Sequence, residues 1–187
     1  MEIMAQPLSF KDTIVIRSRP DVLFRLVLDP KRRTRWDPNI RLANYVGEEK
    51  LASGTLVNIK LERRLLGLSY TAKYGQIQAP FRGGWEAVKP FGPIEKYTQS
   101  WVFKNIPGGT EVTLSTNATI RYNFIGKQIE AQLRNMSGQT LIELQRAVDQ
   151  QGAQLMEDTA KQFQDKMRAE KAAAKKQGKT KKPKAAK

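Results

Sequence analysis

The chain of 187 residues contains neither cysteine nor histidine, and its formal net charge is +15. This length suits one domain with a continuous core that needs no disulfide or metal. The two missing residue types exclude disulfide bonds, zinc sites built on Cys or His, and nucleophiles of the Ser-His-Asp or Cys-His kind. We therefore expect no metal and no cofactor, and any catalysis would have to use other side chains.

The positive charge is concentrated near the C-terminal end. Residues 166–187 contain ten Lys or Arg and one acid, whereas the other 165 residues hold 23 bases and 17 acids. The first ten residues carry Glu2 and lack the basic and apolar regions of a signal peptide. No stretch approaches 18 consecutive apolar residues. We therefore expect no membrane-spanning helix and a cytoplasmic location.

The N-terminal part of the chain predicts one strand followed by two short helices. Phe10–Arg17 is rich in β-branched residues and predicts the strand. Pro20-Asp21 favours the first turn of a helix, which Asp29-Pro30 ends. Lys31–Trp36 predicts the second helix, closed by Asp37-Pro38.

Six further strands are predicted between residues 40 and 122, because β-rich runs alternate there with turn residues. Pro107-Gly108-Gly109 gives the clearest hairpin signal, and turns this short make neighbouring strands antiparallel. The predicted strands are Arg41–Glu48, Thr55–Arg63, Leu68–Gln78, Gly84–Lys89, Lys96–Ile106 and Glu111–Tyr122.

A long amphipathic helix is predicted from about Lys127, because apolar residues recur at helical spacing as far as Val148. Gly152 weakens this helix, and helical periodicity resumes over residues 153–171. Residues 172–187 consist mostly of Ala and Lys, which bury too little apolar surface to fold, so we expect a disordered basic tail.

Four short motifs follow one another along the chain: the stretch from Pro20 to Pro30, Arg35-Trp36-Asp37-Pro38, Ser100-Trp101-Val102-Phe103 and Gly108-Gly109-Thr110-Glu111-Val112. In this order they resemble the START-like or helix-grip superfamily (SRPBCC), which includes the polyketide cyclase/dehydrase-type family. The resemblance implies an α+β helix-grip fold. A seven-stranded curved antiparallel sheet would wrap around a long C-terminal helix, with two short helices between the first and second strands.

The resemblance also implies a domain organisation and a kind of site. We expect an N-terminal extension over residues 1–9, a START-like helix-grip domain over 10–152, a helical extension over 153–171 and the basic tail over 172–187. Members of this superfamily bind lipids, sterols, polyketides or other hydrophobic molecules in a cavity between sheet and helix. They share no universal catalytic motif, so the catalytic residues stay unknown.

Alternation along the predicted strands places an aromatic-rich set of side chains on the sheet face toward the helix. Two interpretations stay open: a ligand pocket, apolar with a few convergent polar groups, or a filled core whose Tyr and Trp side chains bond to the backbone. The ligand interpretation requires a hollow interior. The predicted ligand-binding residues are Tyr70, Tyr74, Trp85, Tyr97, Gln99, Trp101, Phe103, Trp36, Leu133 and Met136.

Several polar residues have both a functional and a structural interpretation. Trp36 either lines the cavity opening or anchors the short helices, and Asp37 is interpreted as a turn or cap residue rather than a general acid. A basic patch could attract an anionic head group or form a solvated helical face; it consists of Lys31, Arg32, Arg33 and Arg35. Acid–base catalysis would need a group within hydrogen-bond distance of the substrate and with a suitable pKa, and the sequence shows neither property. The candidate residues are Glu86, Glu62, Lys60, Arg82 and Arg121.

Three functional hypotheses follow. The leading one is binding or transport of a hydrophobic small molecule, such as a lipid, an isoprenoid or a polyketide-like compound. The second is a metal-free polyketide aromatase/cyclase or dehydratase-type enzyme, which the lack of a reliable inward carboxylate disfavours. The third is non-specific contact of the tail with nucleic acid or an anionic membrane. The lysines predicted to bind polyanions are Lys175, Lys176, Lys179, Lys181, Lys182 and Lys184.

Overall fold

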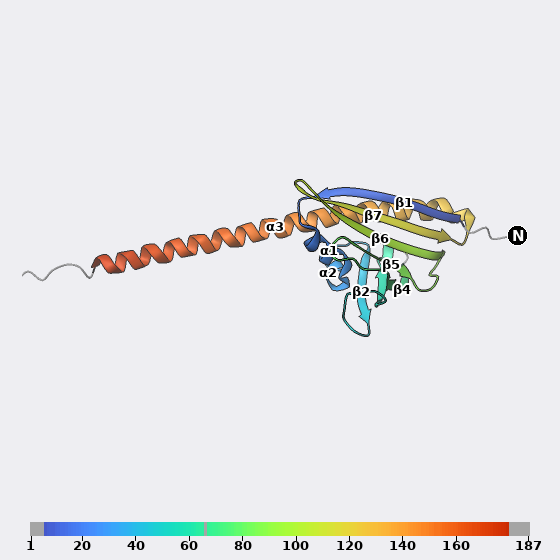
Figure 1. Cartoon of the computed structure of the whole chain (residues 1–187), viewed down its shortest axis with the longest axis horizontal. Coiled ribbons are helices and arrows are strands. Elements are labelled where there is room, and N and C mark those ends of the chain that lie inside the picture. Colours follow the sequence, from blue (N-terminus) through green and yellow to red (C-terminus); the bar gives the residue numbers. More distant parts are fainter. Residues whose placement is uncertain (1–5, 66, 180–187) are drawn as a thin grey trace, which may run out of the picture. The chain divides into compact units, whose positions relative to one another are not determined.

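A computed structural model describes the backbone of residues 6–65 and 67–179 and the side chains of residues 7–63, 65, 67–122 and 124–152. Figure 1 shows the strands as one curved sheet. None of the described helices is long and apolar enough to cross a membrane. The strands are β1 (Gln6–Ile16), β2 (Ile40–Val46), β3 (Leu56–Leu61), β4 (Ser69–Tyr74), β5 (Arg82–Ala87), β6 (Ile94–Ile106) and β7 (Gly109–Ile120). The α-helices are α1 (Pro20–Leu28), α2 (Pro30–Arg33) and α3 (Gly126–Lys179), and two short 3₁₀ helices cover Arg63–Leu65 and Asn123–Ile125.

Within the described residues the seven strands form one sheet in the order β1-β7-β6-β5-β4-β3-β2, and every neighbouring pair is antiparallel. Two short helices lie between the first and second strands, and a long helix follows the last strand. The predicted α+β helix-grip fold is therefore confirmed.

The turn between β6 and β7 depends on glycine. Gly108 has a φ of 88°, which favours glycine. At Gly109 a Cβ atom would lie 2.3 Å from the carbonyl oxygen of Ile16, so a side chain cannot fit between the hairpin and the end of β1. The predicted Pro107-Gly108-Gly109 turn thus also sets how closely β1 approaches β7.

Most strand ends differ from the prediction by one or two residues, and two differ by four. β1 begins at Gln6, four residues before the predicted start at Phe10. β4 ends at Tyr74 rather than at Gln78, because the chain turns back there: the Gln78 N–H donates to the Arg82 carbonyl oxygen at 2.8 Å. Strand propensity alone did not indicate this local turn.

The chain divides into two compact units, Met1–Val148 and Asp149–Lys187. The second unit continues α3, whose backbone is helical through Gly152 and as far as Lys179. The helix therefore includes residues 172–179, where we expected the disordered tail to begin. Residues 180–187 lie outside the described part of the chain, and the predicted domain boundaries stay predictions.

The inner face of the sheet forms one hydrophobic core with α1 and the first part of α3. Burial alternates along β7 and β6, as a sheet with one covered face requires. Leu133, Met136, Leu141 and Leu144 of α3 are buried in the same core cluster. Asn58 and Lys60, which alternate with the buried residues of β3, are exposed on the outer face.

Candidate functional site

The structure brings most of the predicted ligand-binding residues together in the interior. Nine of the ten are buried, and they come from β4, β5, β6 and α3. Their rings touch in pairs. Tyr70 meets Tyr97 edge to face with centroids 5.8 Å apart, and Tyr74 meets Trp85 in the same way at 6.0 Å. Trp101 and Phe103 lie nearly parallel at 6.3 Å.

Trp36, the tenth residue, has an anchoring role. Its side chain is half-buried, and its indole N–H donates to the Leu26 carbonyl oxygen at 3.0 Å. The bond ties the turn after α2 to the last part of α1. Among the two sequence interpretations of Trp36, the geometry matches the structural one.

Arg33 lies in the interior rather than on the surface. Lys31, Arg32 and Arg35 are exposed, but Arg33 is only 5% exposed. The prediction that Arg33 belongs to a surface basic patch is therefore wrong. Its Nε donates to the Asp37 carboxylate at 2.9 Å, and this pair offsets much of the cost of burying the charge.

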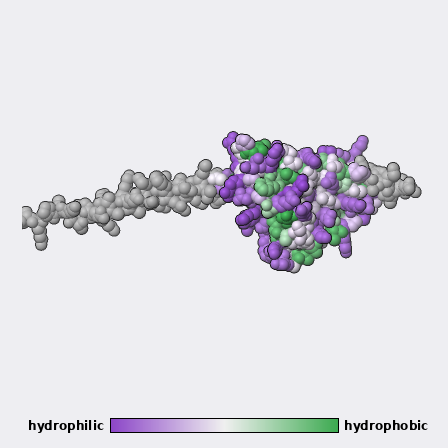
Figure 2. Space-filling view, viewed as in Figure 1, coloured by the Kyte–Doolittle hydropathy of each residue, from purple (hydrophilic) through white to green (hydrophobic). Residues whose placement is uncertain are grey.

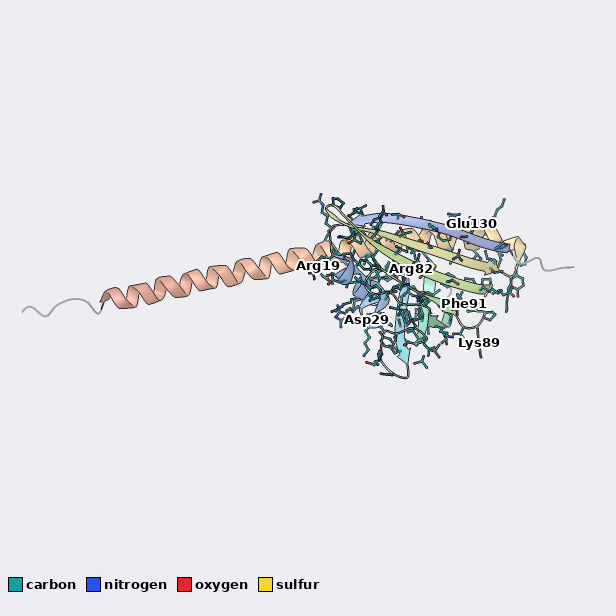
Figure 3. The ribbon with its side chains drawn as sticks, viewed as in Figure 1. Arg19, Asp29, Arg82, Lys89, Phe91 and Glu130 are labelled. Carbon is teal, nitrogen blue, oxygen red and sulfur yellow. The ribbon has the colours of Figure 1, made fainter. Side chains whose placement is uncertain are left out.

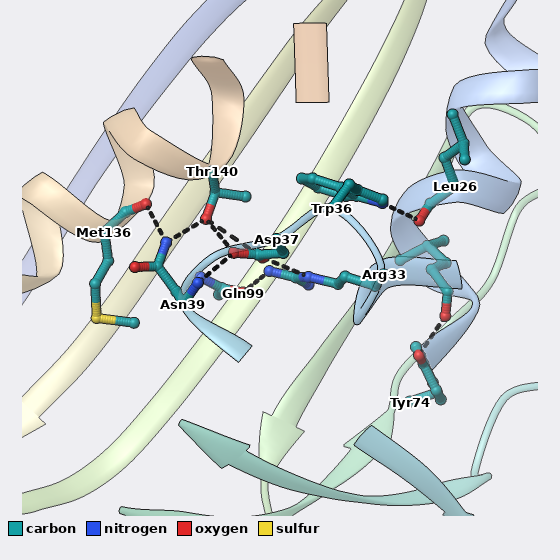
Figure 4. Close-up of polar contacts among 10 residues, drawn as sticks. Leu26, Arg33, Trp36, Asp37, Asn39, Tyr74, Gln99, Met136 and Thr140 are labelled. Carbon is teal, nitrogen blue, oxygen red and sulfur yellow. Dashed lines mark hydrogen bonds and ion pairs between the residues drawn. The ribbon is translucent and has the colours of Figure 1, made fainter. Parts of the chain in front are cut away.

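Asp37 is the centre of a buried hydrogen-bond network (Figure 4). Besides Arg33, it accepts from the Asn39 backbone N–H at 3.0 Å and from the Thr140 hydroxyl at 3.2 Å. The Asn39 side-chain amide donates to that same hydroxyl at 2.9 Å and to the Met136 carbonyl oxygen at 3.1 Å. Asp37 is thus a turn residue, as predicted, but it also connects α2 to α3.

Two tryptophan rings flank the Arg33 guanidinium. Its central carbon lies 4.5 Å from the Trp85 ring centroid and 5.5 Å from the Trp101 centroid, distances at which a buried cation is attracted to the ring face. One terminal nitrogen reaches the Gln99 side-chain oxygen at 3.5 Å, a long hydrogen bond. The guanidinium thus occupies the middle of the predicted ligand site.

Several buried polar atoms of the interior have no hydrogen-bond partner within the described residues. They are Arg33 Nη1, Trp85 Nε1, Trp101 Nε1, Thr116 Oγ1 and Ser137 Oγ, with Asp12 Oδ2 on β1 as a sixth. Trp85 and Thr116 both pair in register with Gln99, so these side chains form one row across β5, β6 and β7. A buried polar group without a partner costs about 1–3 kcal/mol, so this cluster needs an explanation.

Three tyrosine hydroxyls in this interior stay protonated well above neutral pH. Burial raises the pKa of Tyr70 to about 12, although Arg33 and the nearby Trp85 indole act to lower it. The Trp85 N–H is thus close enough to influence this hydroxyl without meeting hydrogen-bond geometry. Burial also raises the pKa of Tyr97 and of Tyr74, whose hydroxyl donates to the Leu28 carbonyl oxygen.

Little free space remains beside Arg33. A cavity lined by Arg33, Tyr74 and Trp85, among others, has a volume of ≈ 10 Å³, about enough for one water molecule. The interior next to the guanidinium is therefore filled by side chains, which matches the filled-core interpretation there. The hollow that the ligand interpretation requires is absent among these residues, so a ligand could enter only if side chains moved.

A larger groove of ≈ 770 Å³ lies at β2, β3 and β4 and the loop after β5. Of the predicted ligand-binding residues, Tyr70 alone is among its described lining residues. Phe91 also lines the groove, stacks on Tyr70 with centroids 4.4 Å apart and meets Tyr97 at 5.8 Å. Lys89 and Phe91 belong to this loop (Figure 3). Tyr70 and Phe91 thus contact both the groove and the interior. Figure 2 shows apolar patches among polar residues on one face of the molecule.

The acid–base candidates do not converge on the interior. Glu86 follows the buried Trp85 on β5 and is exposed on the outer face, where it pairs in register with Lys73 of β4. Lys60 and Arg82 are exposed, and Glu62 and Arg121 are half-buried. The predicted polyanion-binding lysines lie outside the described side chains, so polyanion binding stays a prediction.

Sequence reasoning missed the polar members of the interior, although signals for them existed. Arg33 and Asp37 are four residues apart, the spacing of a helical ion pair. Thr116 stands between the inward-facing Leu114 and Ala118, and Ser137 follows the inward-facing Met136. Their polar character led us to leave them out of the predicted inner face.

No protein-family model and no curated protein matches this chain. Solved structures do. A START superfamily protein from Mycobacterium smegmatis is 12% identical with a TM-score of 0.60, over 79% of this chain and 98% of that one. Ginseng major latex-like protein 151 from Panax ginseng is 12% identical with a TM-score of 0.63, over 75% and 97%. The di-domain ARO/CYC StfQ from the steffimycin biosynthetic pathway is 12% identical with a TM-score of 0.64, over 79% of this chain and 52% of that one.

The chain therefore has the helix-grip fold of START superfamily proteins. The resemblance seen in the four sequence motifs is confirmed as a likeness of fold.

Proposed function

We propose that this protein binds a hydrophobic small molecule between the inner face of its sheet and α3. The observation that carries the proposal is the cluster of buried polar atoms without partners, set among aromatic rings around Arg33. An apolar site with a few convergent polar groups is the usual composition of a small-molecule pocket. Solved proteins with this fold, including the di-domain ARO/CYC StfQ from the steffimycin biosynthetic pathway, support a ligand-handling role.

Binding requires the interior to open, because the space beside Arg33 holds about one water molecule. Tyr70 and Phe91 are the side chains to move, since they touch the groove of ≈ 770 Å³ on one side and Tyr97 on the other. Phe91 lies in the loop between β5 and β6, and its backbone bonds Ile94 at the start of β6. A change of its side-chain rotamer does not require these backbone bonds to break. We therefore propose that ligands reach the interior past this ring pair.

The test measures uptake of prodan, a naphthalene dye with a ketone group whose emission changes in apolar surroundings. Purified protein is first analysed by native mass spectrometry for a co-purified molecule, and a separate sample is extracted with organic solvent to recover that molecule. Phe91→Ala is expected to speed uptake of prodan by removing the stacked ring. Phe81→Ala is the matched control, because Phe81 is also a loop phenylalanine but is 55% exposed.

Saturable uptake that becomes faster in Phe91→Ala and not in Phe81→Ala supports the proposal. Absence of a co-purified molecule, together with no saturable dye binding by either the wild type or Phe91→Ala, would refute it. Dye binding that is equally fast in all three proteins would place the access route elsewhere.

A further inference from the structure

We propose that the ligand of this interior carries an uncharged carbonyl group, which Arg33 and the tryptophan N–H groups would bind. This inference rests on the proposed function and adds the chemical class of the ligand. It follows from two properties of the interior: the kind of hydrogen-bonding groups left without a partner, and the charge balance around them.

Three of the six unpaired atoms can only donate a hydrogen bond, two are hydroxyl oxygens, and the sixth, Asp12 Oδ2, can only accept. A guanidinium nitrogen and an indole nitrogen can donate a hydrogen bond but cannot accept one. Arg33 Nη1, Trp85 Nε1 and Trp101 Nε1 therefore all need an acceptor. Thr116 Oγ1 and Ser137 Oγ are hydroxyls, which can donate as well. The missing partner is thus an acceptor such as a carbonyl oxygen.

The charge of the acceptor is restricted by Asp37. Arg33 and Asp37 are the only fully buried charged residues of the described chain, and they neutralise each other at 2.9 Å, while the half-buried Asp12 on β1 adds a further carboxylate with one enclosed oxygen. A ligand carboxylate would place a second negative charge in this interior and leave it without a counterion, which is costly. Asp37 is also held by Asn39 and Thr140, so it is not free to give up its place to another anion.

A carbonyl oxygen satisfies both conditions, because it accepts hydrogen bonds through two lone pairs and adds no charge. Ketones, esters and amides on an apolar body belong to this class. A purely hydrocarbon ligand would leave the donors unpaired. An alcohol oxygen could accept from them, but its own O–H would add one more donor that needs an acceptor, which a carbonyl does not.

The experiment compares three dyes with one naphthalene body: prodan with its ketone, an analogue with a carboxylate, and an analogue with a propyl group. A hydrogen bond to a charged donor predicts that wild-type protein binds the ketone at least about tenfold more tightly than the propyl analogue. The carboxylate is expected to bind most weakly. These comparisons need no variant, so they stand even if a variant fails to fold.

Two variants test which residues are responsible. Arg33→Met combined with Asp37→Asn removes the guanidinium while the interior stays neutral, and it should bring the ketone-to-propyl affinity ratio close to one. Arg146→Met, at a position with a 65% exposed side chain, should leave that ratio unchanged. Infrared spectra of isotope-labelled ketone give an independent readout, since the carbonyl stretch of the bound dye should lie lower in the wild type than in the double variant.

The possible outcomes separate the two proposals. If no dye binds and no molecule co-purifies with the protein, the proposed function fails. If the propyl analogue binds as tightly as the ketone, or the carboxylate binds best, ligands are taken up but the carbonyl assignment is overturned.

Discussion

Replacing Asp37 with asparagine isolates the charge of the buried ion pair. The side chains of Arg33 and Asp37 are 6% and 0% exposed. Asparagine keeps an oxygen that can accept from Asn39 and Thr140, so the main change is that the guanidinium loses its counterion. Removing one partner of a buried pair costs about 3–5 kcal/mol, a large part of the roughly 5–15 kcal/mol that stabilises a typical domain.

Adding Arg33→Met should recover much of this loss, because the double variant leaves no unbalanced charge in the interior. The expected result is a double variant more stable than Asp37→Asn alone. Urea unfolding followed by circular dichroism measures both, provided that the slope against urea stays constant. The control is Glu130→Gln, which removes one charge of the pair that Glu130 forms with Arg134 at the same four-residue spacing, with side chains 32% and 50% exposed. That change should cost under about 1 kcal/mol.

The reasoning is wrong if Asp37→Asn is no more harmful than Glu130→Gln. It is also wrong if the two interior substitutions add, since additivity would mean that the charges do not interact. Either result would show that solvent reaches the guanidinium in solution.

Three further predictions concern single residues. In Tyr70→Phe the loss of stability at alkaline pH should be smaller: the folded-state pKa of about 12 exceeds the ordinary tyrosine pKa of 10.0, so the stabilisation by Tyr70 is complete below pH 10 and up to about 3 kcal/mol of it is lost as pH rises toward 12. Urea unfolding of both proteins at neutral and alkaline pH checks this, and parallel pH profiles would contradict it. Gly84→Ala should be strongly destabilising because its Cβ would lie 2.3 Å from a backbone oxygen of β6, whereas Gly138→Ala in α3 has open space and should stabilise by about 0.5–1 kcal/mol; thermal unfolding compares the two. Trp36→Phe should cost about 1 kcal/mol or more by removing the bond to α1 while leaving the rate of prodan uptake unchanged, and a slower uptake would assign Trp36 to the access route instead.

The sequence was sufficient for the fold because its local signals agreed with one another. The Pro107-Gly108-Gly109 turn, the alternation along β6 and β7, and the helical spacing after Lys127 each indicate one element, and short turns leave only antiparallel pairing. The inner face was predictable for the same reason: in a strand, the position of Trp85 or Trp101 fixes the face of every second residue.

The chemistry of the interior was harder to predict because it depends on tertiary contacts. Arg33 belongs to a four-residue helix, too short for a pattern of apolar residues to tell which side is buried. Three basic neighbours suggested a surface, and only the structure places Asp37, Trp85 and Trp101 around this one guanidinium. The volume of free space in the interior could not be predicted from the sequence either, because it depends on how the side chains pack. The same inward-facing residues can line a pocket or fill a core.

The network around Asp37 gives the polar interior a second consequence. Asp37 bonds Arg33 on one side and Thr140 of α3 on the other, so the guanidinium cannot move far without straining a bond to the helix. A ligand that accepts a hydrogen bond from Arg33 in its present position leaves this network intact. A ligand that displaces Arg33 has to break the bond between Arg33 and Asp37. This asymmetry favours ligands that fit beside the guanidinium over ligands that replace it. It also explains why a buried ion pair, which contributes little to stability by itself, can set the position of a binding group.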